Sequence, residues 1–314
     1  MNRPPLLLIG LLLTLPLSFA STSTRKPANT VVFAVVGDTQ RTLPEEKVLG
    51  REQNDLERDE IVDAIVAEHP AFLVHLGDMV DWGESTYVWN RFDRLIKPVR
   101  DAKIPIFPVL GNHDYFGRHK NVSLANAYAR FPQLKDSHWY TKTTEGLALI
   151  FLDSNMEKLS APLWNQQLAW LKKTLSDFNA DPAIRGIIFF NHHPAFTNSK
   201  ITGDEPAINQ FILPIFRSSK KTIAYITGHA HGYEHFEDGG KQFIISAGGG
   251  GPRVEYLTGT EARHKDLFNG PAPRPFNYLL IQANDNEVVV RVKGFNKGQH
   301  LSDLRVIDTI TIPY

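Results

Sequence analysis

The segment Val31-Val32-Phe33-Ala34-Val35-Val36-Gly37-Asp38-Thr39-Gln40 joins six consecutive apolar residues to a short polar cluster. An apolar run of this length, rich in β-branched residues and ending abruptly at glycine, predicts a buried β-strand. Asp38 and Gln40 follow the strand and can each offer an oxygen atom to a metal ion. In α/β sheets, sites gather beyond the carboxyl ends of the strands, so this cluster predicts a functional site at the strand's end.

The same pattern recurs four times. The later polar clusters are Gly77-Asp78-Met79-Val80-Asp81, Gly111-Asn112-His113-Asp114, Asn191-His192-His193-Pro194 and Gly228-His229-Ala230-His231. The apolar runs before them are 72–76, 104–110, 186–190 and 222–227. If the five strand ends lie side by side, their Asp, Asn, Gln and His side chains converge on one spot. Packing alone does not explain such a convergence.

The rest of the chain predicts the layers around these strands. Helical periodicity is expected over 55–68, 85–99, 121–130, 164–178 and 205–216. Further strands are expected over 138–142, 147–152, 233–236, 242–247, 277–283, 288–294 and 306–312. Strand and helix alternate in the first two thirds, and strands dominate the last third. We therefore expect one α/β domain over residues 30–314, a four-layer α-β-β-α sandwich of two packed mixed β-sheets flanked by helices.

The composition narrows the function classes. Lys+Arg and Asp+Glu both number 34, so no net charge attracts nucleic acid or an anionic membrane. We expect no nucleic-acid partner, although a local basic patch would be compatible with a neutral total. The chain has no cysteine, which excludes disulfides, zinc thiolates and cysteine nucleophiles.

The N-terminus has the pattern of a secretory signal. Asn2-Arg3 is followed by the apolar stretch 6–19, and Ser18 and Ala20 place small residues before a cleavage point. We expect a signal peptide over 1–20, a polar linker over 21–29, and a periplasmic or secreted protein without other membrane attachment. An uncleaved anchor is the alternative, but the stretch is short for a span of about 20 residues.

The residue types of the clusters suit two adjacent metal ions. Two neighbouring cations need several oxygen and imidazole ligands, with a shared carboxylate to offset their repulsion. The chain supplies such a set in Asp38, Gln40, Asp78, Asn112, His192, His229 and His231. Oxygen and imidazole ligands together favour Mn, Fe or Zn, and the sequence does not decide among these metals.

In this order, the five clusters resemble the calcineurin-like metallophosphoesterases, which include purple acid phosphatases and cyclic-nucleotide phosphodiesterases. The resemblance runs from about Val31 to His231, and the closing β-segment resembles the second sheet of that family. It implies that Asp38, Gln40, Asp78 and His231 hold one metal. It also implies that Asp78, Asn112, His192 and His229 hold the other, with Asp78 as the bridge.

The resemblance also implies catalytic roles. His113 corresponds to the general acid, and Asp81 to the carboxylate that orients its imidazole. A hydroxide bridging the metals would attack the phosphorus of a mono- or diester, Asn112 and the metals would stabilise the equatorial oxygens, and His113 would protonate the leaving oxygen. His193 has two interpretations, a substrate contact or simple packing.

Two positions depart from common family patterns. Gln40 stands where many relatives have His, which predicts a more loosely held first metal. Asp81 stands where purple acid phosphatases carry Tyr, which predicts a colourless protein. Asp204 and Glu205 precede a helix, and capping explains them adequately, with a substrate-side role as the alternative. The alternative to an enzyme is a module that binds metals and phosphate esters without turnover. A small phosphate ester is the expected partner, and the oligomeric state is not readable.

Overall fold

The computed structural model describes Met1 and residues 30–314. The predicted signal peptide over 1–20 and the linker over 21–29 lie outside this described part, apart from Met1. Among the helices that are described, none combines the length and the apolar character needed to cross a lipid bilayer.

The first sheet carries three of the five strand-end clusters. Its order is β12-β11-β10-β1-β2-β3. The central strands β1 (Val31–Val36), β2 (Leu73–His75) and β3 (Ile106–Pro108) are parallel to one another. The antiparallel strands are β10 (Phe276–Ala283), β11 (Glu287–Phe295) and β12 (Arg305–Pro313). Because β1 to β3 run in one direction, the clusters that follow them emerge at one edge.

The second sheet carries the two histidine clusters, in the order β4-β5-β6-β7-β9-β8. Its strands are β4 (Tyr140–Thr144), β5 (Leu147–Phe151), β6 (Gly186–Asn191), β7 (Thr222–Thr227), β8 (Tyr233–Asp238) and β9 (Lys241–Ser246). The core β5-β6-β7-β9 is parallel, and β4 and β8 pair antiparallel at its edges. Both sheets are therefore mixed.

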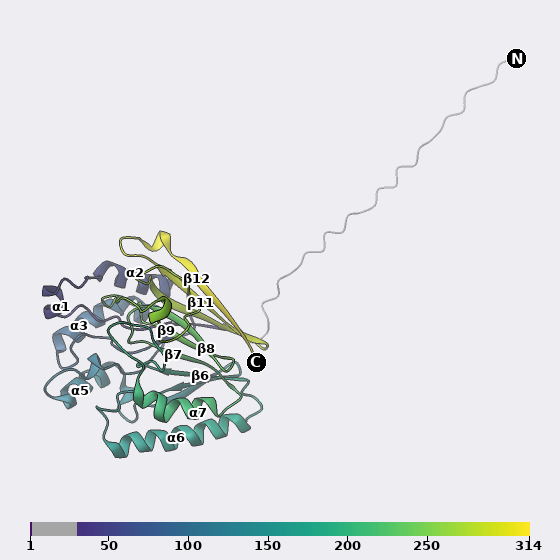
Figure 1. The fold of residues 1–314 in the computed structure, drawn as a ribbon, viewed down its shortest axis with the longest axis horizontal. Helices are drawn as coiled ribbons and strands as arrows, with labels where there is room; N and C mark the ends of the chain where they lie inside the picture. The colour runs from purple at the N-terminus through teal and green to yellow at the C-terminus, as the bar shows by residue number, and fades with distance from the viewer. Residues whose placement is uncertain (2–29) are drawn as a thin grey trace.

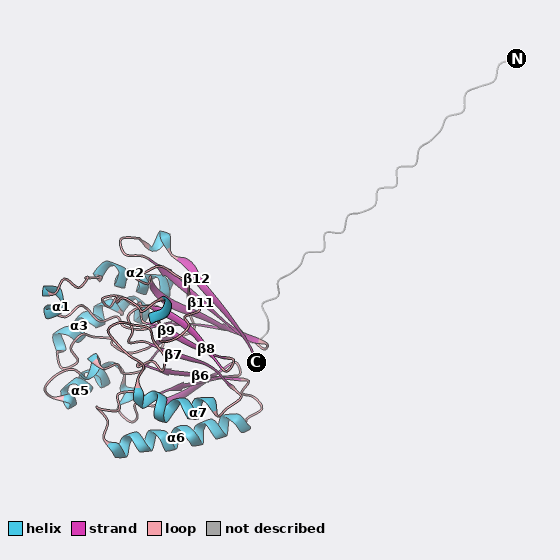
Figure 2. Cartoon of the chain, in the orientation of Figure 1, coloured by secondary structure: helices cyan, strands magenta, loops and turns pink. Residues whose placement is uncertain are grey.

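Helices cover the outer faces of the two sheets (Figures 1 and 2). On one side lie α2 (Asp55–Ala67), α3 (Thr86–Leu95), α4 (Lys97–Asp101) and α5 (Lys120–Arg130), and on the other α6 (Ala161–Ala180) and α7 (Leu213–Arg217). The short helix α1 (Pro44–Val48) follows the first cluster. Short 3-10 turns are η1 (His113–Tyr115), η2 (Pro132–Leu134), η4 (Gly259–Glu261) and η5 (Leu301–Asp303). This arrangement confirms the predicted four-layer sandwich.

Three apolar clusters hold the layers together. Between the sheets, Phe33, Phe151 and Phe190 are fully buried, and the last two stack with ring centroids 5.2 Å apart. A second cluster packs α6 and α7 against the second sheet, and a third packs α2 and α3 against the first. Burial on this scale is the main stabilising term of the fold.

Prolines break two of the expected helices. The helix predicted over 85–99 divides into α3 and α4 around Ile96, because Pro98 cannot donate to the carbonyl of Arg94. The helix predicted over 205–216 contains a π-turn, η3 (Ile208–Ile212), before α7. Pro214 lacks the N–H that would continue the regular ladder.

The closing strands divide differently from the expectation. Only β8 and β9 join the second sheet, whereas β10 to β12 extend the first. β1 is buried on both faces and pairs with β10 over Val31–Val35. β10 thereby satisfies the backbone groups on the side of β1 that β2 leaves open.

Candidate metal centre

The ends of strands from both sheets meet around one polar site. Asp38, Asp78 and Asn112 follow β1, β2 and β3, and His192 and His229 follow β6 and β7. Direct backbone bonds tie the turns together: the Asp38 N–H donates to the Gly77 carbonyl, and the Gly228 N–H donates to the His192 carbonyl. The structure thus brings together all seven residues that the sequence analysis proposed as metal ligands.

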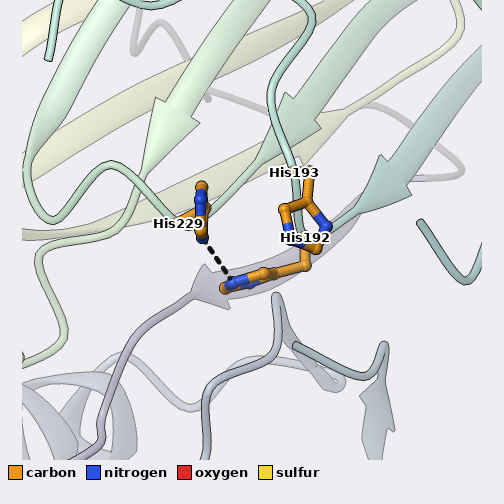
Figure 3. Close-up of side chains that lie close together, drawn as sticks. All are labelled: His192, His193 and His229. Carbon is orange, nitrogen blue, oxygen red and sulfur yellow. Dashed lines mark hydrogen bonds between the residues drawn. The ribbon is translucent and has the colours of Figure 1, made fainter. Parts of the chain in front are cut away.

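One group of potential ligands surrounds the His192 ring. Its Nε2 lies 3.3 Å from Asp78 Oδ2, 3.1 Å from Asn112 Oδ1 and 3.1 Å from His229 Nδ1. His192 Nδ1 lies 2.8 Å from the Leu76 carbonyl, to which it donates, so a neutral ring directs the lone pair of Nε2 at the other three atoms. Figure 3 shows the His192 and His229 rings turned toward each other. An outer hydrogen bond that fixes the ring in this way is typical of a metal-binding histidine.

The second group contains Asp38, Gln40, Asp78 and His231. Ligand atoms of Asp38, Asp78 and His231 lie within 4.8 Å of one another. His231 Nδ1 donates to the Pro252 carbonyl at 2.8 Å, which leaves Nε2 facing Asp38 Oδ1 at 3.6 Å. Asp78 Oδ2 belongs to both groups, because it also lies 3.2 Å from the Gln40 amide. Its position is that of a bridging carboxylate.

The surroundings of the Gln40 amide show whether this group of residues fits a metal ion. Its nitrogen faces Asp78 Oδ2 and His231 Nε2, while its oxygen is buried without a hydrogen-bond partner among the described residues. The two ends of an amide have nearly the same shape. A half-turn would place the oxygen between the same two groups, where it could join Asp38, Asp78 and His231 as a ligand. The donor set therefore fits a hard or borderline cation.

Four of the proposed ligands have left-handed backbone conformations. The φ angles are 61° at Asp38, 51° at Asp78, 71° at His229 and 45° at His231. Residues with a side chain rarely adopt this region, and such strain gathers at functional sites. It turns the side chains out of the strand directions and toward one another.

Burial and charge set the protonation of the site. Burial lowers the pKa of His231 to about 4 and that of His229 well below the usual value, so both rings are neutral near pH 7. Burial also disfavours charge on His192, but the Asp78 carboxylate outweighs it and raises that pKa to about 9. For Asp78, burial is overcome by His192 and His113, and the pKa falls well below the ordinary range. The negative charge that favours a proton on His192 would equally favour a metal cation.

His113 lies above the shared carboxylate, with Nε2 4.0 Å from Asp78 Oδ2. Its Nδ1 lies 3.0 Å from the backbone carbonyl of Asp81. A carbonyl can only accept, so Nδ1 carries a hydrogen and Nε2 faces the site. The structure gives this hydrogen bond to the backbone of Asp81 rather than to the carboxylate that the sequence pattern suggested. Asp81 also lines a cavity between α2 and α3.

Two residues without a predicted role, Gly111 and Asp114, hold the turns together. Asp114 is fully buried and accepts hydrogen bonds from the N–H groups of Gly111, Met79 and Val80. It thereby joins the cluster after β2 to the cluster after β3. A side chain at Gly111 would place its Cβ 2.2 Å from Asp78 Oδ1. The only signal in the sequence was that Gly111 and Asp114 frame the Asn112-His113 pair.

His193 lies beside the metal ligands but makes different contacts. Its ring centroid is 4.5 Å from that of His229, and its nitrogens could join His192 and His229 around an ion. However, its Nδ1 bonds Ser154 Oγ at 2.8 Å, and Ser154 Oγ also accepts the His193 backbone N–H. This contact occupies Nδ1, so Nε2 is the ring nitrogen of His193 that remains to meet a ligand.

These observations define a two-sheet α/β protein with a cluster of candidate metal ligands at its strand ends. The family model for calcineurin-like phosphoesterases matches residues 31–233. The chain belongs to this family, and the groups around His192 and His231 contain its candidate metal ligands.

Individual relatives agree with this assignment. A probable cyclic nucleotide phosphodiesterase of Rhodopseudomonas palustris is 29% identical over 52% of this chain and 57% of its own length. A probable inactive purple acid phosphatase of Arabidopsis thaliana is 19% identical over 76% of this chain and 43% of its own length. The chain thus spans about half the length of these curated relatives. A purple acid phosphatase from yellow lupin seeds shares the fold with a TM-score of 0.68, covering 91% of this chain and 54% of that chain at 15% identity.

Proposed function

We propose that this protein is an exported phosphoesterase that holds two metal ions and hydrolyses mono- or diesters of small phosphate compounds. The position of Asp78 Oδ2 carries the proposal. It lies 3.3 Å from His192 Nε2 and 3.2 Å from the Gln40 amide, between the two groups of candidate ligands. One buried carboxylate oxygen shared by two ligand sets is what a dinuclear site requires.

Each ion would have its own set of ligands. Asp38, Gln40, Asp78 and His231 would hold one ion, and Asp78, Asn112, His192 and His229 the other. When bound, a pair of divalent or trivalent ions supplies charge neutralisation of the phosphate and a water of lowered pKa. The Asn112 amide lies at the edge of the cluster, where its N–H₂ group can donate to a phosphate oxygen.

His113 would act on the leaving group. The Asp81 carbonyl fixes the hydrogen on Nδ1, so the proton that a charged ring can transfer lies on Nε2, which faces the site. General acid catalysis of this kind contributes typically 10²–10⁴-fold to the rate. A module that only binds metal and phosphate would gain nothing from this arrangement.

The test measures nitrophenol release from mono- and bis-nitrophenyl phosphate after loading with Mn²⁺, Fe²⁺ or Zn²⁺. We expect turnover of at least one ester, lost on chelation and in Asp78→Asn. Measurement of bound metal runs in parallel. Two ions bound per chain with no turnover of either ester would favour the non-catalytic module, and the Arabidopsis relative is named as inactive.

Export is supported by the sequence 1–20 alone. We expect the mature protein purified from the native cell envelope or medium to begin at Ser21. Intact-mass measurement checks this, and a mass that retains the apolar stretch 6–19 would instead indicate an anchor.

A further inference from the structure

A cleft of about 740 Å³ opens from the metal site. Asn112, His193 and His229 line its inner end, and the segments 154–158 and 205–211 form its walls. Its volume is within the range of small-molecule sites. Phe116 lines the cleft and contacts the His113 ring, with centroids 4.2 Å apart. Since His113 is the proposed acid for the leaving oxygen, the cleft lies where the group attached to that oxygen would go.

His193 directs an unused polar atom into this cleft. The side chain is only 9% exposed, and Ser154 occupies its Nδ1. Its Nε2 forms no hydrogen bond with a described residue. Nε2 is therefore available to a ligand at the boundary between the metal site and the cleft. A polar atom left available beside a cleft is suited to a hydrogen bond with a substrate, for example at an ester oxygen.

The outer part of the cleft combines apolar surface with carboxylates. Phe116, Met156 and Phe211 are its apolar lining residues. Glu157 and Glu205 line the same space, and neither carboxylate forms an ion pair with a described residue. Glu205 accepts only the Ala207 N–H, and burial followed by the charge of Glu157 raises its pKa. Lys158 also lines the cleft, but its ammonium group reaches neither glutamate.

We propose that this cleft binds a cationic leaving group, so that the substrates are phosphate esters of small amino alcohols such as choline. This inference rests on the proposed phosphoesterase function. Aromatic faces and unpaired carboxylates together recognise alkylammonium ions. The same two carboxylates disfavour an anionic leaving group, such as the next nucleotide of a polynucleotide.

The test compares choline with 3,3-dimethylbutan-1-ol, which has the same shape without the charge. Ligand-detected NMR follows the methyl signals of both compounds on the metal-loaded protein and does not depend on turnover. We expect choline to bind about tenfold more tightly, by the combined effect of ring faces and charge, and to compete with whichever nitrophenyl ester is hydrolysed. Equal binding, or tighter binding of the alcohol, would overturn the inference.

Two variants, one that removes a negative charge from the cleft and one that removes a positive charge, separate the effect of charge from that of shape. Glu205→Gln keeps an oxygen for the Ala207 N–H, so the local backbone contact survives. We expect it to remove most of the preference for choline. Lys158→Gln removes a positive charge from the same cleft and should maintain or increase that preference. A Glu205→Gln protein that melts normally and still prefers choline to the same degree would contradict the proposal.

The two proposals can fail independently. Choline preference without hydrolysis of any ester would leave the cleft assignment standing and reject the phosphoesterase. Hydrolysis of nitrophenyl esters without a preference for choline would support the phosphoesterase and reject the cleft assignment.

Discussion

At the residue scale, the decisive details are single atoms. Asp78 Oδ2 joins the two ligand groups, and His113 Nε2 lies 4.0 Å from it. The ring of His113 is held by a backbone carbonyl, which no substitution of the Asp81 side chain removes. The proposed general acid is thus paired with the expected residue, but through its backbone.

We predict opposite outcomes for His113→Asn and Asp81→Asn. Loss of the acid should lower kcat by about 10²–10⁴-fold on an alkyl phosphate ester. The loss should be smaller on a nitrophenyl ester, whose leaving group needs little protonation. Asp81→Asn should reduce kcat on the alkyl ester by a few-fold at most. Steady-state kinetics on both esters tests this, and equal losses in the two variants would show that the Asp81 carboxylate does matter.

At the element scale, the site depends on how closely the turns after β2 and β3 approach. Asp114 accepts three backbone N–H groups from these turns, and Gly111 leaves no room for a side chain beside Asp78. The seven candidate ligands are therefore positioned by contacts between turns as well as by the strands.

We predict that Gly111→Ala disrupts metal binding. Its Cβ would lie 2.2 Å from Asp78 Oδ1, so the bridging carboxylate must move. Overpacking typically costs about 1–3 kcal/mol of stability, and bound metal should fall after dialysis. Gly203→Ala is the matched control, because a Cβ there meets nothing within 4 Å. Elemental analysis of both variants is the measurement. Full metal content in Gly111→Ala would count against a bridging role for Asp78.

At the scale of the whole molecule, the site joins two sheets. The first sheet supplies Asp38, Asp78 and Asn112, and the second supplies His192, His229 and His231. The apolar layer around Phe151 and Phe190 already holds the sheets together. Metal ions bound across this junction would add to the stability that the buried apolar layer provides.

Metal removal should therefore lower Tm without unfolding the protein at room temperature. A ligand present at 100 times its Kd stabilises by about 2.7 kcal/mol, which corresponds to a shift of roughly 5 °C or more in a domain of this size. Thermal melts followed by circular dichroism before and after chelation measure the shift. An unchanged Tm, with loss of metal verified, would mean that the ions do not link the sheets.

Much of the fold and the site could be predicted because the signals are local. Each apolar run that ends at Gly or a polar residue marked a strand end, and five such ends gave the candidate ligand set. The α3–α4 break, the π-turn before Pro214 and the division of the closing strands were missed. Proline geometry and the pairing needs of β1 override periodicity at these places.

The sequence by itself determined the four layers, the family and the residue types at the site. Only the tertiary structure decided which atoms face one another: the shared oxygen of Asp78, the Asp81 carbonyl on His113, the Ser154 hydroxyl on His193, and the cleft with Glu157 and Glu205. The physical reason is the distance along the chain over which each kind of interaction acts. Strand and turn preferences act between neighbours in the chain, whereas these contacts join turns from two sheets whose mutual position is set by the buried core between them.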